Sequence, residues 1–105
     1  MKISLKDLKE KHNLLFEGED YSFYVLSENK HDKVPDHFHD DWDESWFVLE
    51  GKYNITTNKK TYVLEKGDFL EVDRKIIHSV VCKENNSKRI AIFKKGIEII
   101  NKEEK

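Results

Sequence analysis

Short apolar runs separated by polar turns extend through most of this chain. Nine stretches are rich in β-branched and aromatic residues, which pack well on a pleated sheet, and we expect them to be strands. These stretches are 14–16, 21–27, 34–39, 44–49, 52–57, 61–65, 69–72, 77–83 and 88–93. Glycine, asparagine and aspartate mark the turns between them, as at Gly51 and Gly67. Such short and even spacing predicts an all-β sandwich or barrel.

One helical element is expected, at the N-terminus. Ser4 with Asp7 three residues later resembles a helix-capping arrangement. The apolar residues between Ile3 and Leu8 could then seat a short helix or an extended arm that continues to about residue 11.

The length of the chain and the absence of a linker predict one compact domain. The chain has 105 residues, enough for one modest core and too few for two, so residues 1–105 are expected to form a single domain. No repeat or linker interrupts it, and residues 101–105 are expected to be a frayed tail.

Composition narrows the classes of partner and the compartment. The chain has 19 basic and 21 acidic side chains, a formal net charge of −2, and no basic stripe interleaved with aromatics, so nucleic acid is not an expected partner. Residues 1–13 lack the apolar stretch of a secretory signal, and no apolar run approaches membrane-spanning length, so we expect a cytoplasmic protein with no membrane partner. The single cysteine, Cys82, excludes an internal disulfide and fits a reducing compartment.

Three histidines and a glutamate form the most informative pattern. Side chains alternate along a strand, so His37 and His39 are expected to point the same way and Phe38 the opposite way. A polar turn would bring Glu44, at the start of the next strand, back beside this pair, whereas His78 can join only if the sheet brings its distant strand alongside. Three imidazoles and one carboxylate suit a divalent transition metal.

The same residues resemble a known family. Residues 37–51, HFHDDWDESWFVLEG, fit the first sequence motif of the cupin superfamily from its first histidine to its last glycine. Gly67 and His78 stand at the spacing of the second motif. Four positions depart from the family pattern, in which glycine is usual at His31 and Lys75, proline at Asp73 and asparagine at Cys82.

The resemblance has implications for fold, metal and assembly. It implies a small antiparallel jelly-roll barrel over about residues 21 to 93, a homodimer, and a metal site. The implied ligands are His37, His39, Glu44 and His78. The ion could be iron, manganese, zinc, nickel, cobalt or copper, because supply in the cell and not affinity alone sets occupancy. A barrel that keeps these positions but binds metal weakly or not at all is the alternative.

Strand alternation predicts what surrounds the site. If Glu44 faces inward, Trp46 and Val48 share its face, and Trp46 is either a wall of a ligand pocket or plain core. Phe47 and Leu49 then face outward, where a second copy of the chain or the N-terminal arm of the same chain would cover them.

Other polar residues have simpler interpretations. The acidic residues Asp36, Asp40, Asp41 and Asp43 are expected to form a solvated turn, in preference to extra ligands or a mouth selecting cations. Arg74 and Lys75 are likewise expected in a solvated turn, in preference to binding a carboxylate ligand.

The remaining reactive side chains are expected to be structural. We interpret Cys82 as a buried inert thiol, and His12 and His31 as surface residues. Tyr53 and Tyr62 could donate protons by type, but packing roles are favoured.

The function suggested is metal-dependent chemistry on a small molecule. An ion with open positions could serve an isomerase, lyase or dioxygenase acting on a small oxygenated or thiol-bearing molecule. No further catalytic residue is assigned, and no glycine loop for an organic cofactor is found. The alternative is a non-catalytic metabolite-binding or sensing module; the lack of a fused DNA-binding helical domain favours the enzyme.

Overall fold

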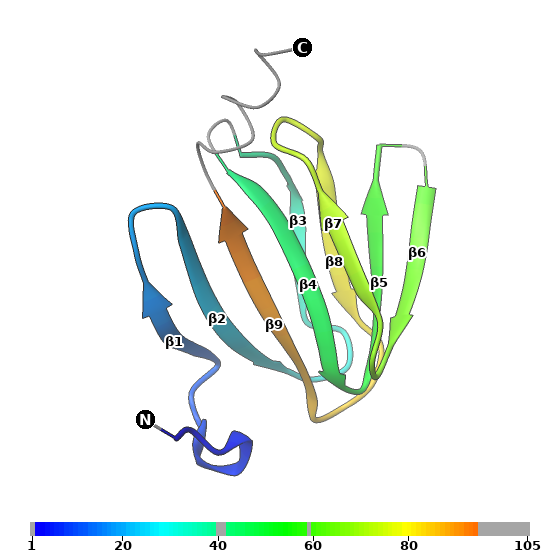
Figure 1. The fold of residues 1–105 in the computed structure, drawn as a ribbon. Coiled ribbons are helices and arrows are strands. Elements are labelled where there is room, and N and C mark those ends of the chain that lie inside the picture. Colours follow the sequence, from blue (N-terminus) through cyan, green and yellow to red (C-terminus); the bar gives the residue numbers. More distant parts are fainter. Residues whose placement is uncertain (1, 40–41, 59, 95–105) are drawn as a thin grey trace.

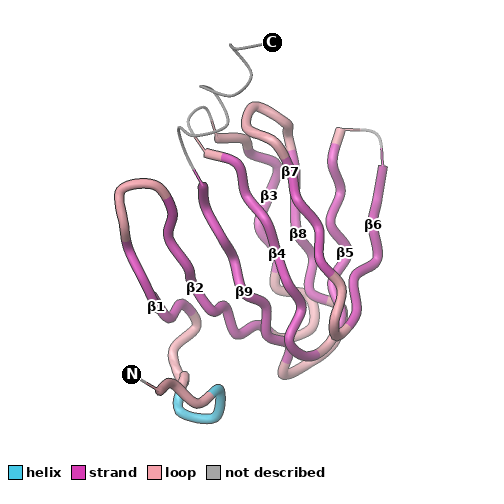
Figure 2. Tube along the Cα trace, viewed as in Figure 1, coloured by secondary structure: helices cyan, strands magenta, loops and turns pink. Residues whose placement is uncertain are grey.

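The computed structural model of the protein describes residues 2–39, 42–58 and 60–94, which form two antiparallel sheets packed face to face (Figure 1). The strands are β1 (His12–Glu17), β2 (Tyr21–Glu28), β3 (Lys33–His37), β4 (Asp43–Glu50), β5 (Lys52–Thr57), β6 (Lys60–Glu65), β7 (Phe69–Val72), β8 (His78–Cys82) and β9 (Ser87–Lys94). All nine predicted strands are present. Within these described residues strands dominate, and helix is confined to the N-terminal end (Figure 2).

The strand order is that of a small jelly-roll barrel. One sheet has five strands in the order β1-β2-β9-β4-β7, and the other has four in the order β3-β8-β5-β6. The last strand, β9, lies between β2 and β4, so segments from both ends of the chain are hydrogen-bonded neighbours. The predicted all-β jelly-roll class is confirmed.

The N-terminal element is shorter than a regular helix. It is a single 3-10 turn, η1 (Leu5–Asp7), with no buried residue. Ser4 precedes it in an extended conformation and its side chain makes no capping hydrogen bond, so the predicted cap is wrong. Three residues without a buried face are too few to sustain an α-helix, so this segment is an arm. The predicted tail at 101–105 lies outside the described residues.

The core lies between the two sheets. Trp46 and Val48 on β4 are fully buried there, together with Tyr53 and Ile55 on β5 and Val80 on β8. The predicted inward parity of Trp46 and Val48 is confirmed. Burial of large side chains from both sheets is the main favourable term that holds the sandwich together.

The turn after β4 requires glycine. Gly51 has a φ of +84°, a conformation that residues with a side chain rarely adopt. A Cβ atom at this position would also collide with the Oγ atom of Ser87. The glycine that ends the first motif therefore has a steric role.

The outward face of the five-stranded sheet is apolar. Phe47 lies directly between Ile90 on β9 and Phe69 on β7 in the strand register. Phe23 similarly lies between Ile92 and Phe16. Phe69 is 57% exposed and Phe16 is 46% exposed, so the N-terminal arm leaves much of this face uncovered.

The two sheets differ in width. The β1–β2 hairpin projects at one side of the sandwich (Figure 1). Leu14 pairs with Tyr24 on the inner face of this hairpin, yet Leu14 is 51% exposed. The sandwich is therefore incompletely closed at β1. None of the helical structure in the described ranges is long and apolar enough to cross a membrane.

Candidate metal centre

The four residues singled out in the sequence come together in the structure. His37, His39, Glu44 and His78 each offer one donor atom, and these atoms all lie within 4.8 Å of one another. The Oε1 atom of Glu44 is 3.0 Å from Nε2 of His39 and 3.1 Å from Nε2 of His78. The ring of His37 lies 4.2 Å from that of His78, centroid to centroid. Such a group could hold a metal ion.

Three elements position these side chains. His37 is the last residue of β3 and pairs directly with His78, the first residue of β8. Glu44 is the second residue of β4, in the opposite sheet. The group therefore forms where the ends of strands from both sheets meet.

His39 reaches the group in a different way from the one predicted. Strand β3 ends at His37, and its register with β8 shifts between Val34 and His37, so the two histidines do not share a regular strand. Pro35 falls within this irregular stretch of an edge strand. Such a position suits proline, which has no N–H to donate to the hydrogen bonds between strands. His39 is instead held in the following loop, where its carbonyl accepts a hydrogen bond of 2.7 Å from the Lys75 N–H.

Backbone carbonyls orient two of the rings. Nδ1 of His37 is 2.9 Å from the carbonyl oxygen of Pro35, and Nδ1 of His78 is 2.9 Å from that of Ile76. Each ring donates Nδ1–H to a carbonyl, which leaves its Nε2 lone pair directed at the group. This tautomer is the one that a neutral imidazole uses to bind a metal, so the donor set fits a divalent cation.

The protonation of His78 is coupled to Glu44. Burial on its own would lower the pKa of His78, but hydrogen bonds to Glu44 and to the Ile76 carbonyl, with the negative charge of Glu44, outweigh burial and raise that pKa. The raised pKa favours the protonated form of His78 beside Glu44. A cation bound to the Nε2 atoms would replace that proton.

A cavity of about 490 Å³ adjoins the group. His37, His39 and Glu44 form part of its wall. Most of the remaining wall is apolar. Its aromatic and aliphatic members are Tyr24, Leu26, Val34, Trp42, Val80, Ala91 and Phe93. The pocket predicted around the site is therefore present, but Trp46 is fully buried in the core cluster, which decides between its two interpretations in favour of packing.

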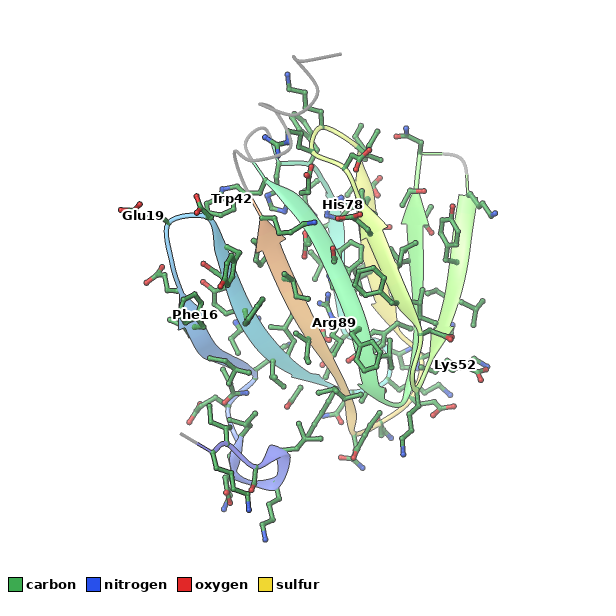
Figure 3. All side chains as sticks on the ribbon, in the orientation of Figure 1. Phe16, Glu19, Trp42, Lys52, His78 and Arg89 are labelled. Atoms are coloured by element: carbon green, nitrogen blue, oxygen red, sulfur yellow. The ribbon has the colours of Figure 1, made fainter. Side chains whose placement is uncertain are left out.

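A buried ion pair borders the same cavity. Arg89 lines the wall and binds Glu28 through two hydrogen bonds, Nε to Oε1 at 2.8 Å and Nη2 to Oε2 at 3.0 Å. In Figure 3, Arg89 lies lower in the view than Trp42 and His78. Sequence analysis missed this pair, although both residues occupy inward positions of their strands and that parity was a usable signal.

A second buried ion pair corrects two predictions. Asp43 and Arg74 were expected in solvated turns, but their side chains are only 3% and 10% exposed and they bind each other. Asp36 is exposed as expected, and Asp40 and Asp41 lie outside the described residues. The error arose because a polar sequence predicts solvent contact unless its distant partner is known.

Two of the residues that depart from the cupin pattern have a positive φ, which glycine adopts most readily. His31 has a φ of +81° and Lys75 a φ of +70°, and both stand where the family usually has glycine. These residues adopt the left-handed conformation despite their side chains.

The other reactive side chains lie outside the group of four. His12 and His31 are exposed, as predicted, and His12 lines the cavity. Cys82 is fully buried, with its thiol 3.1 Å from the Glu84 carbonyl oxygen. Burial in the first place, and then the charge of Glu28, raise the pKa of Tyr53, which favours a packing role.

The chain belongs to the cupin domain family, whose sequence model matches residues 22–93. Quercetin 2,3-dioxygenase from Bacillus subtilis (strain 168) is 30% identical over 80 residues, which are 74% of this chain and 24% of that protein. This chain therefore spans about a quarter of the length of that curated relative.

Solved structures share the fold. A cupin superfamily protein from Desulfitobacterium hafniense DCB-2 matches with a TM-score of 0.77 and 20% identity, covering 91% of this chain and 92% of that one. KdgF from Halomonas sp. also matches with a TM-score of 0.77, at 17% identity, covering 85% of this chain and 82% of that one.

Proposed function

We propose that this protein is a metal-dependent enzyme acting on a small oxygenated molecule. The observation that carries the proposal is the position of the donor group. Three imidazoles and one carboxylate lie within 4.8 Å of one another at the wall of a largely apolar cavity of about 490 Å³. If four protein donors held an octahedral ion, it would keep positions for further ligands, as expected of a site that acts on a ligand.

The proposed ligands are His37, His39, Glu44 and His78. When bound, a divalent transition metal supplies Lewis acidity or redox activation of dioxygen. The carbonyls of Pro35 and Ile76 hold two of the rings in the binding tautomer. The carboxylate of Glu44 would offset part of the positive charge of the ion.

The cavity favours a substrate with an apolar body and at least one oxygen. Tyr24, Trp42 and Phe93 offer aromatic surface for such a body. The charge of Arg89 is already balanced by Glu28, so Arg89 does not favour an anionic substrate. Among isomerase, lyase and dioxygenase chemistry, similarity to a protein named quercetin 2,3-dioxygenase makes the dioxygenase type the first to test.

The proposal is tested by metal content and turnover. The protein is purified without chelator, its metal is identified by elemental analysis, and oxygen consumption is measured with flavonols, diketones, thiols and sugars. Turnover by the wild type that is lost in Glu44→Ala supports the enzyme. Bound metal and tight ligand binding without turnover on any of these classes would instead establish the non-catalytic binding or sensing module. A wild type that binds no divalent metal overturns the site.

We also propose that two copies of the chain pair through the outward face of the five-stranded sheet. Its support is two neighbouring apolar rows across this sheet, Phe16–Phe23–Ile92 and Ile90–Phe47–Phe69, with Phe69 57% exposed. An apolar face of this kind is usually buried against another subunit.

Light scattering tests the pairing with two matched variants. Phe69→Glu is expected to give a monomer, whereas Val63→Glu is expected to remain a dimer. Val63 is 55% exposed and lies on β6 in the other sheet, so it controls for added charge at an exposed apolar site. A wild-type protein that is monomeric at micromolar concentration contradicts the proposal.

A cytoplasmic location and a single-domain organisation remain proposals. The buried free thiol of Cys82 is compatible with a reducing compartment. Cell fractionation with antibody detection tests the location, and limited proteolysis tests the organisation.

A further inference from the structure

We infer that Asp43 and Arg74 are positioning residues that hold the backbone around the metal donors in a binding geometry. The inference rests on the proposed metal site. The carboxylate of Asp43 accepts three hydrogen bonds from Arg74: its Oδ1 binds the backbone N–H at 2.7 Å and Nε at 3.1 Å, and its Oδ2 binds Nη2 at 3.2 Å. One carboxylate thus fixes both the main chain and the side chain of Arg74.

This pair joins two segments that carry donors. Asp43 directly precedes Glu44 on β4, and Arg74 lies in the loop between β7 and β8 that leads to His78. The next residue in that loop, Lys75, donates its N–H to the carbonyl of His39 at 2.7 Å. The loop therefore contacts or adjoins the backbone beside three of the four donors.

The same loop also orients a donor ring. The carbonyl of Ile76 accepts the Nδ1–H of His78 at 2.9 Å, and the N–H of Ile76 is 3.3 Å from the carbonyl oxygen of Asp73. A displacement of this loop would therefore move the acceptor that sets the orientation of the His78 ring. Asp43, by fixing Arg74, opposes that displacement.

Energetic considerations favour positioning over simple stabilisation. A buried ion pair loses hydration on both partners, so it often contributes little net stability compared with apolar residues of similar size. The loop also carries Lys75 at a φ of +70°, which costs about 1 kcal/mol for a residue with a side chain. Such a conformation persists only where the surroundings determine it, and the adjacent contacts are the Asp43–Arg74 pair and the hydrogen bond from the Lys75 N–H to the His39 carbonyl.

Metal binding is sensitive to the position of the loop between β7 and β8. Donor atoms must lie within a few tenths of an ångström of their bonding distances, so a loosened loop weakens binding without removing any ligand. Loss of groups that support metal ligands typically weakens metal affinity by about 10- to 100-fold.

The test measures Co²⁺ affinity by chelator competition, with the Co²⁺ absorption spectrum as a second readout. Asp43→Asn and Arg74→Leu are each expected to bind Co²⁺ about 10- to 100-fold more weakly than the wild type. The double variant is expected to be no weaker than the single ones, because the two residues act as a unit. Arg74→Lys keeps the charge and the backbone hydrogen bond, and is expected to give an intermediate affinity.

Two controls separate positioning from general destabilisation. Leu64→Ala removes a buried side chain on β6, so it is expected to lower the melting temperature while leaving Co²⁺ affinity within about twofold of the wild type. In the metal-free protein, the amide hydrogen of Lys75 is expected to exchange faster in Asp43→Asn than in the wild type.

The outcomes distinguish this inference from the proposed function. If the wild type binds Co²⁺ and either Asp43→Asn or Arg74→Leu binds it equally well, positioning is overturned and the metal site stands. If Leu64→Ala weakens Co²⁺ binding as much as the substitutions at Asp43 and Arg74, the effect is general and positioning is again overturned. A wild type without Co²⁺ affinity overturns the metal site, and the inference with it.

Discussion

The Nε2 atom of His78 lies 3.1 Å from the Oε1 atom of Glu44, although 34 residues separate the two in the sequence. His78 begins β8 in the four-stranded sheet and Glu44 lies on β4 in the five-stranded sheet, so this contact spans the sandwich. A cation held by both residues would therefore link the two sheets, and its removal would affect both stability and chemistry.

Removing either residue is expected to lower bound metal sharply. Glu44→Ala and His78→Ala each delete one donor from the group of four, whereas His12→Ala alters an exposed histidine outside that group. Elemental analysis of the purified variants, with wild type alongside, measures metal per chain. Excess metal should also raise the melting temperature of wild type and His12→Ala but not that of His78→Ala. Equal metal content in all three variants would remove the assignment of the site.

Alanine is expected to be tolerated far less well at Gly51 than at Gly67. Both glycines have positive φ, +84° and +91°, so each substitution incurs the conformational cost of about 1 kcal/mol. At Gly51 the new Cβ would also overlap the Ser87 side chain, whereas at Gly67 no atom lies within 4 Å. Chemical denaturation should therefore show a loss of at least about 2 kcal/mol for Gly51→Ala and about 1 kcal/mol for Gly67→Ala. Equal losses would contradict the steric role of Ser87.

Glycine at position 75 is expected to be neutral or slightly stabilising. Lys75→Gly relieves a positive φ of +70°, a gain of about 1 kcal/mol, offset by the greater freedom of glycine in the unfolded chain. We expect the free energy of unfolding to rise by about 0.5 kcal/mol in denaturant titrations. Lys33→Gly, on strand β3, is the control and should lose stability because glycine weakens a strand. A loss above about 1 kcal/mol in Lys75→Gly would show that the lysine side chain has a structural role.

Tyr53 is expected to stay protonated in the folded protein well above the usual range for tyrosine. Burial in the first place, and then the charge of Glu28, raise its pKa, so the folded state loses stability through this group only as the pH rises above about 10, where the unfolded chain releases the proton. The chain has four tyrosines. At about pH 11, phenolate absorbance should have the same amplitude in wild type and Tyr53→Phe while both remain folded. A smaller amplitude in Tyr53→Phe would show that the buried phenol ionises.

The strands and the donor group were both predictable from the sequence because local patterns carry them. Each strand is a short apolar run bounded by turn residues, and the runs at 52–57 and 69–72 match β5 and β7 without any shift. The donors follow a fixed spacing that one motif holds together, apart from His78. The strands could thus be predicted from neighbouring residues, and the donor residues from a known motif.

The buried ion pairs were not predictable in the same way. Asp43 and Arg74 are 31 residues apart, and Glu28 and Arg89 are 61 residues apart. At Asp43 and Arg74 nothing local distinguishes a charged residue that meets such a partner from one that meets water. At Glu28 and Arg89 strand parity indicates an inward position but not which residue is the partner. The position of His39 outside β3 likewise involves a distant residue, because its carbonyl accepts a hydrogen bond from the N–H of Lys75.

The unequal width of the two sheets has a consequence for how this scaffold can diversify. Strand β1, which projects from the sandwich, contributes His12 and Glu17 to the cavity wall, whereas the four donors come from β3, the loop after it, β4 and β8. Substitutions on that hairpin can therefore reshape the cavity while the donor group keeps its arrangement. Under the proposed function, ligand selectivity and metal binding would lie on separate parts of one small protein, so that each could change without the other.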